Sequence, residues 1–215
     1  MAAVGVPIGY FGAMIHDLPR TFVLTVKPTW NKWLIAEQHL KDRGIPAEPF
    51  LCIDRKLCQL NPILTFDVNK PGEQICSSQV IACLSHYLIW KVMSYLPDDS
   101  FWVLEDDCQF DFDWRHQYSE AMSVLPDDWD LVFIGSCCCE GRPTIPVGKN
   151  LYEVQWPMCG HGIMYRKKSL PVLLEVHQKI WAPLDIAMFM ESLPKLRVYT
   201  ILPRIVNQRD TTLLP

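Results

Sequence analysis

A run of apolar residues that ends directly in three acidic residues, Phe101-Trp102-Val103-Leu104-Glu105-Asp106-Asp107, constrains the fold most. The apolar part is short and bulky, which is typical of a buried strand. Because ionised carboxylates are costly to bury, the three acids must emerge at the carboxyl end of that strand. Open α/β sheets bind their ligands at this edge. The sequence therefore predicts an α/β fold with an acidic site after the strand at 101–104.

The three consecutive acids predict a metal site. Side chains alternate along an extended chain, so Glu105 and Asp107 should point the same way and Asp106 the opposite way. Two paired carboxylates suit a hard divalent cation that carries a phosphate-bearing substrate. The alternative is a solvated acidic turn at a strand end, which the triplet alone does not exclude.

Strand and helix patterns alternate along the rest of the chain. Strands are predicted at 21–26, 48–53, 129–135, 151–156, 162–165 and 197–202, and helices at 30–43, 78–96, 114–125, 169–180 and 184–193. This order indicates a mostly parallel central sheet with helices on both faces. No repeat or low-complexity linker divides the 215 residues, so we expect a single domain. Residues 54–74 are expected to form a long functional loop.

The predicted helix at 78–96 carries Val80, Leu84, Leu88 and Val92 at four-residue spacing. This spacing predicts an apolar stripe that faces the core. His86 lies about two positions off the stripe. It is therefore expected either to line a cleft or to form a structural hydrogen bond between helix and loop.

Two blocks of this region resemble the core signature of glycosyltransferase family 25. The first is A-C-L-S-H-Y-L-I-W-K at 82–91, and the second is W-V-L-E-D-D at 102–107. Weaker matches follow, namely D-L-V-F-I-G at 130–135, C-G-H-G-I-M at 159–164, P-L-D at 183–185 and P-R-I-V-N-Q at 203–208. The family includes bacterial lipooligosaccharide galactosyltransferases and procollagen galactosyltransferase domains. The family's N-L-x-x-x-x-x-R pattern after the first strand is missing here.

The resemblance implies a GT-A fold, in which a Rossmann-like nucleotide-sugar half (about 20–110) shares its sheet with an acceptor half (about 111–215). It implies a metal-dependent inverting glycosyltransferase that moves a hexose from a UDP-sugar to a hydroxyl of a glycan, lipid-linked or protein-linked. In this family the acidic motif holds Mn²⁺, or alternatively Mg²⁺, on the donor's diphosphate. By this resemblance Glu105 and Asp107 match the outer positions of the motif and Asp106 its middle position.

Other residues, some of them in the matched segments, are candidates for the same site. His86 and Thr25, at the end of the first strand, are expected to contact the donor together with Asp106. His161 lies between two glycines, which permit close backbone approach, and is a candidate third metal ligand. An ordinary turn at His161 is the alternative.

An inverting transfer needs one carboxylate base within reach of the acceptor hydroxyl. Asp185 is the first candidate, because it matches the family's P-x-D segment and because the other acids would occupy the diphosphate side. A carboxylate at a helix start also interacts well with the helix dipole whatever its function. Asp210 and Asp111 are the next candidates.

Charge and cysteine content limit the function and the compartment. A net charge of −4 and a pI near 5.8 argue against a general nucleic-acid binder, and favour a glycan acceptor over DNA. No apolar run is long enough to span a bilayer, and residues 1–14 lack the positive start of a signal peptide. We expect a cytoplasmic protein, with peripheral binding at a membrane surface left open.

The nine cysteines are expected to be free thiols, because their number is odd and no export signal is recognised. Three adjacent residues, Cys137-Cys138-Cys139, cannot all point at one zinc ion from a strand, so a loop that lines the cleft is favoured over a zinc site.

Two other functions use the same features. A metal-dependent nucleotidyltransferase or phosphotransferase could use the same carboxylate pair, although no G-x-x-x-x-G-K-[ST] motif is present. A catalytically inactive, glycosyltransferase-like binding module is favoured by the missing first-strand motif and disfavoured by the intact acidic triplet.

Overall fold

The computed structural model describes residues 18–26, 31–53, 77–137, 144–154 and 157–209. The strands are β1 (Arg20–Thr25), β2 (Glu48–Leu51), β3 (Ser100–Glu105), β4 (Cys108–Phe110), β5 (Leu131–Cys137), β6 (Thr144–Gly148), β7 (Leu151–Val154), β8 (Met158–Arg166), β9 (Val198–Ile201) and β10 (Val206–Gln208). The helices are α1 (Asn31–Asp42), α3 (Ser77–Tyr95), α4 (Trp114–Met122), α5 (Leu170–Val176) and α6 (Leu184–Ala187), with short helical turns η1 (Lys167–Ser169), η2 (Met188–Ser192) and η3 (Leu193–Lys195).

The main sheet has eight strands in the order β2-β1-β3-β8-β5-β9-β7-β6, and β4 pairs with β10 in a second, two-stranded sheet. The pairs β1–β2, β1–β3 and β5–β9 are parallel, whereas β8 is antiparallel to both β3 and β5. β7 is antiparallel to β9 and to β6. Six of the eight strands in the described main sheet therefore run in one direction, which confirms the predicted mostly parallel α/β sheet.

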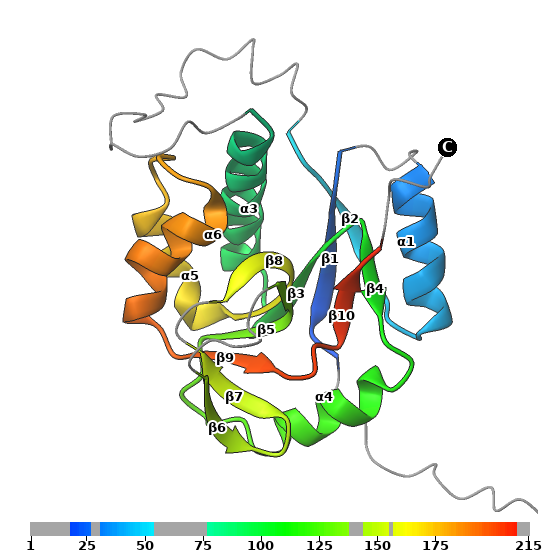
Figure 1. Ribbon diagram of the computed structural model, residues 1–215. Coiled ribbons are helices and arrows are strands. Elements are labelled where there is room, and N and C mark those ends of the chain that lie inside the picture. Colours follow the sequence, from blue (N-terminus) through cyan, green and yellow to red (C-terminus); the bar gives the residue numbers. More distant parts are fainter. Residues whose placement is uncertain (1–17, 27–30, 54–76, 138–143, 155–156, 210–215) are drawn as a thin grey trace, which may run out of the picture.

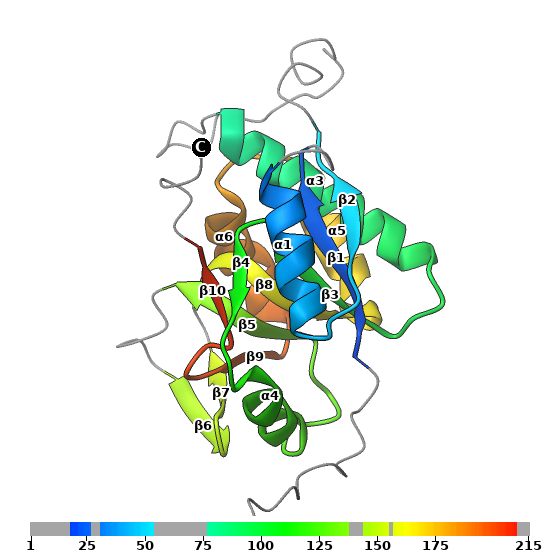
Figure 2. The same ribbon diagram turned by 90° about the vertical axis from the view of Figure 1, so that its right-hand side faces the viewer.

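Helices cover both faces of the sheet, with α1 and α4 on one side and α3, α5 and α6 on the other (Figure 1). Viewed from the α1 side, α1 lies in front of β1 and β3, and α3 and α5 lie behind them (Figure 2). Successive residues of β3 alternate between the two cores. Trp102 and Leu104 pack in the α1 and α4 core, and Phe101 and Val103 in the α3 and α5 core.

The prediction of the buried face of α3 was partly wrong. Leu84 is buried, but Leu88 and Val92 are 37% and 41% exposed. The buried face instead carries Ile89, Trp90 and Met93, none of which is exposed to solvent. Apolar residues occur on nearly every side of this helix, so four-residue spacing alone did not identify the side that meets the sheet.

The extended conformation ends at the first of the three acids, whereas the alternation argument assumed that it continues through Asp107. β3 ends at Glu105, residues 106–107 form a turn, and β4 begins at Cys108. Strand alternation therefore does not apply to Asp106 and Asp107. The direction of each acid follows from its contacts instead.

Several short elements were not predicted from the sequence. β4 and β10 have three residues each, and their antiparallel pairing places Val206 opposite Phe110, far away in the sequence. β6 forms a hairpin with β7, and the predicted helix at 184–193 is divided into α6, η2 and η3. The expected loop at 54–74 lies outside the described residues.

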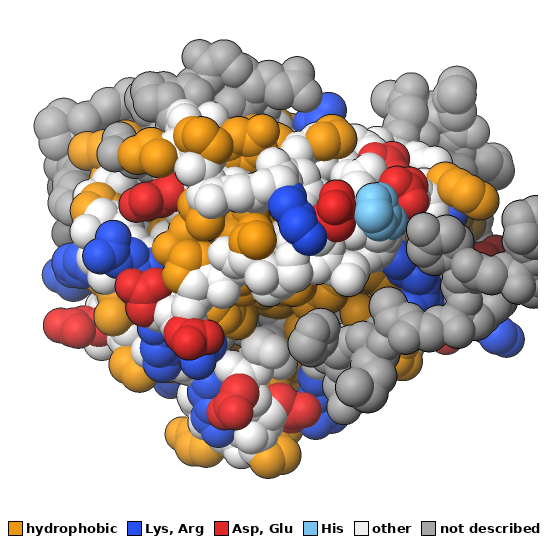
Figure 3. Space-filling view, turned by 90° about the horizontal axis from the view of Figure 1, so that it is seen from below, with side chains coloured by type: hydrophobic (Ala, Val, Ile, Leu, Met, Phe, Trp, Pro, Cys, Tyr) orange, Lys and Arg blue, Asp and Glu red, His pale blue; other side chains and the backbone are white. Residues whose placement is uncertain are grey.

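On the face seen from below, acidic and basic side chains are interspersed (Figure 3). Ion pairs among the described residues include Lys168–Asp130 at 3.3 Å and Arg197–Asp128 at 3.5 Å. Of the cysteines within the described ranges, Cys52, Cys83, Cys108, Cys137 and Cys159 are all free. No helix in the described part of the chain is both long and apolar enough to cross a membrane.

Candidate active site

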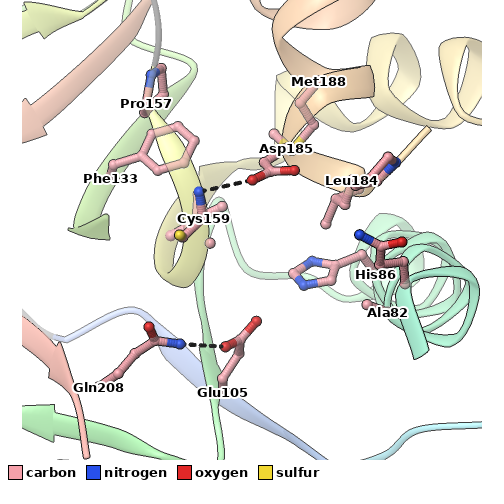
Figure 4. A pocket seen from close by; sticks show the side chains of 14 residues that line it. Ala82, His86, Glu105, Phe133, Pro157, Cys159, Leu184, Asp185, Met188 and Gln208 are labelled. Carbon is pink, nitrogen blue, oxygen red and sulfur yellow. Dashed lines mark hydrogen bonds between the residues drawn. The ribbon is translucent and has the colours of Figure 1, made fainter. Parts of the chain in front are cut away.

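A cavity of about 280 Å³ lies at the carboxyl end of β3. It is lined by residues from α3, β3, β5, β8, α6 and β10, which are far apart in the sequence (Figure 4). Its polar side chains are Gln79, His86, Glu105, Asp185 and Gln208, and its apolar wall includes Phe133, Ile163, Leu184 and Met188. Three of the residues predicted for the site, His86, Glu105 and Asp185, thus face one cavity.

Glu105, the last residue of β3, points into the cavity from one side (Figure 4). Gln208 of β10 donates a hydrogen bond from Nε2 to Glu105 Oε2 at 3.4 Å. Burial, together with the negative charges of Asp107 and Asp106, raises the pKa of Glu105 to about 7. Near neutral pH this carboxyl group is therefore close to half-protonated unless a cation is bound beside it.

Asp106 lies at the ends of β1 and β3. A hydrogen bond with the side chain of Thr25 lowers the pKa of Asp106, although burial gives a net rise. Thr25 is the buried last residue of β1. The two residues, both predicted to contact the donor, therefore contact each other.

Asp107 follows in the same turn, where its backbone oxygen accepts a hydrogen bond from Arg209 N at 2.7 Å. Its Oδ1 is buried and has no hydrogen-bond partner among the described residues. Burial raises the pKa of Asp107, and the positive charges of Lys32 and Arg209 oppose that rise. An unpartnered buried carboxylate oxygen is costly and is well suited to a ligand or cation.

His86 both lines the cavity and belongs to the core. Its side chain is 2% exposed, and its ring centroid lies 6.0 Å from that of Trp90. Burial lowers the pKa of His86 to about 4, and the nearby His177 contributes to the shift. Of the two predicted roles for His86, the structure favours the cleft-lining one, with a neutral imidazole.

Asp185 is fixed on the opposite side of the cavity from Glu105 (Figure 4). Its Oδ2 accepts a hydrogen bond from Cys159 N at 3.3 Å, and its Oδ1 accepts one from Ile186 N at 2.9 Å. Cys159 has a φ of 61°, which non-glycine residues rarely adopt and which is common at functional sites. Two backbone donors thus set the orientation of a carboxylate that faces the cavity.

His161 does not line this cavity. Its side chain is 1% exposed, and its Nε2 lies 3.1 Å from the backbone oxygen of Val206. Burial lowers the pKa of His161. The ring thus joins β8 to β10 through Nε2, while its Nδ1 is buried without a hydrogen-bond partner among the described residues. This contact leaves one ring nitrogen available, so the role of His161 as third metal ligand stays a prediction.

The two other predicted base candidates are not brought to the cavity. Asp111 accepts a hydrogen bond from Asn207 Nδ2 at 2.8 Å, and it does not line the cavity. Asp210 lies outside the described residues. Asp185 is therefore the only one of the three candidates that the described structure places in the cavity wall.

Sequence reasoning missed Lys32 and Gln208 as site residues. Lys32, in the first turn of α1, lowers the pKa of all three acids through its positive charge. Gln208 contacts Glu105 and also accepts a hydrogen bond from Cys137 Sγ at 3.7 Å. Gln208 belongs to the P-R-I-V-N-Q segment, so the family resemblance offered a signal for it, whereas nothing in the local sequence indicated Lys32.

The acidic turn supplies the ligand type that hard cations prefer. Within the described ranges, no cluster of three or more His, Cys, Asp and Glu side chains is arranged to hold a metal. Ions such as Mg²⁺ commonly bind through one or two carboxylates together with substrate phosphates. Glu105 and Asp107, with their crowded negative charge and the unpartnered Oδ1 of Asp107, fit a metal of this kind.

Comparisons with known proteins give no family assignment. No family model matches the chain, and no curated protein matches it significantly, so membership in glycosyltransferase family 25 is not confirmed. Among solved structures, a glycosyltransferase involved in the glycosylation of the major capsid of PBCV-1 is similar, with 11% identity, a TM-score of 0.46, and coverage of 85% of this chain and 81% of that chain. The apo-form glycosyltransferase GlyE of Streptococcus pneumoniae TIGR4 is also similar, with 10% identity, a TM-score of 0.43, and coverage of 85% and 45%.

Proposed function

We propose that the chain is a metal-dependent inverting glycosyltransferase that transfers a hexose from a UDP-sugar to a hydroxyl of a glycan acceptor. The observation that carries this proposal is the cavity that separates Glu105, at the end of β3, from Asp185, at the start of α6. A single displacement needs a site for an anionic leaving group on one side of the sugar and a base on the other. The arrangement of these two carboxylates supports that division, and the UDP-sugar donor follows from the sequence resemblance.

The acidic turn is the proposed side of the leaving diphosphate. Glu105 and Asp107 would hold the metal, and Lys32 adds a positive charge beside the same turn. A divalent cation, when bound, stabilises the negative charge that develops on the departing nucleoside diphosphate. Gln208 holds the Glu105 carboxyl group in place through its hydrogen bond.

Asp185 is the proposed base. As the acceptor oxygen forms its bond to the anomeric carbon, the bond from that carbon to the diphosphate breaks and its electron pair leaves with the diphosphate. The acceptor's proton passes to Asp185, whose carboxylate is oriented by Cys159 N and Ile186 N. Oriented catalytic groups of this kind reduce the entropy that the reaction must otherwise lose.

Calorimetric titration with UDP and Mn²⁺ tests the metal side of the proposal. Asp107→Asn should abolish metal-dependent binding of UDP while the protein remains folded, because the residue lies in a turn. Asp111→Asn is the matched control, since Asp111 Oδ1 accepts a hydrogen bond from Asn207 Nδ2, whereas Asp107 Oδ1 has no partner among the described residues. Equal metal-dependent affinity for UDP in the wild type and in Asp107→Asn would overturn the metal assignment.

A hydrolysis assay with UDP-glucose, UDP-galactose and UDP-xylose, with and without Mn²⁺, tests the reaction. The wild type should hydrolyse at least one donor only when the metal is present, and Asp185→Ala should lose about 10²-fold or more of that rate. Binding of UDP-sugars without any turnover would favour an inactive binding module. Release of phosphate or a nucleoside monophosphate, rather than UDP, would favour a phosphotransferase or nucleotidyltransferase.

A further inference from the structure

The cavity between Glu105 and Asp185 has room for a sugar ring, with a volume of about 280 Å³. Its wall is apolar at Phe133, Ile163 and Met188 and polar at His86 and Gln79. A hexose has the complementary surface, with C–H groups on its faces and hydroxyl groups at its rim.

The imidazole of His86 has an unmet hydrogen-bonding group in this wall. Its Nδ1 is buried and has no hydrogen-bond partner among the described residues. Figure 4 shows the ring pointing into the cavity, between Asp185 and Glu105. A buried polar atom without a partner is costly, and a ligand hydroxyl in the cavity would remove that cost.

The ring of His86 is held from behind by a buried aromatic cluster. Trp90 lies 6.0 Å from His86, 6.1 Å from Tyr165 and 5.2 Å from His177, measured between ring centroids. Neither Trp90 nor Tyr165 is exposed to solvent. The imidazole therefore cannot turn away to solvent, and it presents its nitrogen atoms from a fixed position.

His177, on the other side of Trp90 in this cluster, has a hydrogen-bond partner in the protein. Ser192 Oγ donates its one proton to Met188 O at 3.2 Å, so it accepts a hydrogen bond from His177 Nε2 at 3.0 Å. His177 thus has a structural partner and does not line the cavity. Both histidines pack against Trp90, but only His86 lines the cavity. His177 is therefore a matched control for His86.

We infer that His86 forms a hydrogen bond with a hydroxyl of the transferred hexose and thereby determines which hexose the site accepts. This inference rests on the proposed glycosyltransferase function. The low pKa of His86 supports it, because a neutral imidazole offers one hydrogen-bond donor and one acceptor to a ligand hydroxyl. A site built to bind a hydroxyl discriminates strongly against an analogue that lacks it, because the buried polar group of the protein is then left unpaired.

The test measures binding of a series of donors to three variants. The ligands are UDP, the UDP-hexose that binds the wild type most tightly, and its 2-, 3-, 4- and 6-deoxy analogues, each with Mn²⁺. The variants are His86→Phe, which removes the hydrogen bond, His86→Asn, which keeps a polar amide at the same depth, and His177→Asn as the control. Near-UV circular dichroism checks that each variant keeps its aromatic packing.

One deoxy analogue should bind the wild type at least about tenfold more weakly than the full donor, and that ratio should fall to about one in His86→Phe. The affinity for UDP should be unchanged within about twofold, and His177→Asn should keep the wild-type ratio. His86→Asn should retain part of the discrimination, which keeps the test valid if His86→Phe is not folded.

The inference is overturned if every folded His86 variant keeps the wild-type ratio for all four deoxy analogues, or if His177→Asn loses that ratio as much as the His86 variants do. Failure of the wild type to bind any UDP-sugar or UDP is a different result. It would contradict the proposed function itself.

Discussion

Replacing Glu105 by Gln should make the metal-free protein more stable while it removes metal-dependent binding of UDP. Glu105 is held in a site that disfavours its ionised form, because the carboxyl group is buried beside Asp106 and Asp107. Its pKa is about 7 in the folded protein and 4.5 as the reference for an unfolded chain. A neutral glutamine has nearly the same shape and can keep a hydrogen bond with Gln208.

The gain in stability expected from Glu105→Gln depends on pH, because it depends on how far Glu105 is ionised. A folded-state pKa that is raised above the unfolded value means that the folded state binds the proton more tightly, so stability falls as the pH rises from 4.5 to 7. The difference of 2.5 pKa units, at about 1.36 kcal/mol each, gives an upper limit of about 3 kcal/mol at pH 8. At pH 5 the same linkage gives about 1 kcal/mol.

Urea unfolding followed by fluorescence of the eight tryptophans, with a chelator present, measures this difference. We expect the free energy of unfolding of Glu105→Gln to exceed that of the wild type by up to about 3 kcal/mol at pH 8 and by about 1 kcal/mol at pH 5. Addition of Mn²⁺ and UDP should stabilise the wild type and leave the variant unchanged. If the variant is no more stable than the wild type at pH 8, ionised Glu105 does not destabilise the metal-free protein, and this prediction is wrong.

Two further perturbations follow from buried contacts. Gly135→Ala should lower the free energy of unfolding in urea by about 1–3 kcal/mol, because the new Cβ would lie 2.6 Å from His161 Cδ2 and 2.8 Å from Val206 O. Gly148→Ala is the control and should cost much less, because its Cβ meets side-chain atoms only at 3.6 Å. Equal effects of the two substitutions would contradict this prediction. His86 and His177 have pKa values lowered to about 4, so the unfolded state binds protons first and stability falls as the pH drops from 6.5 towards 4. In the Glu105→Gln background, which removes the opposing titration, adding His177→Asn should reduce the loss of stability between pH 7 and pH 5 by about 2 kcal/mol, and an unchanged loss would contradict the assignment.

The central strand and most helices could be predicted because their signals are local. An apolar run that ends in three acids determines both the strand that becomes β3 and the edge at which the acids emerge. Gly44, with a φ of 67°, follows the end of α1, in the left-handed conformation in which glycine commonly ends a helix. In such places the physical cause lies within a few residues of the feature.

The rest depends on contacts between distant parts of the chain. The strands β4 and β10 are three residues long, and they exist because Val206 meets Phe110 rather than because either sequence favours a strand. The contact of His161 Nε2 with the backbone oxygen of Val206 in β10 likewise joins residues that are 45 positions apart. The face of α3 that meets the sheet was decided by packing, since apolar residues surround the helix.

The site itself was partly predictable. The sequence identified Glu105, His86 and Asp185, and all three line the cavity. It did not identify Lys32, whose charge reaches the acidic turn from a separate helix. Strand alternation also failed for Asp106 and Asp107, because the chain turns directly after Glu105.

The stereochemistry of donor hydrolysis tests the proposed inverting transfer most directly. A proton NMR time course with Mg²⁺ and an α-linked UDP-hexose that the protein hydrolyses reports which anomer of the free sugar forms first, with water as the acceptor. The β-anomer should appear first, before mutarotation, and Asp185→Ala should slow its appearance. Initial release of the α-anomer, or no turnover of any UDP-sugar in the panel, would contradict the account.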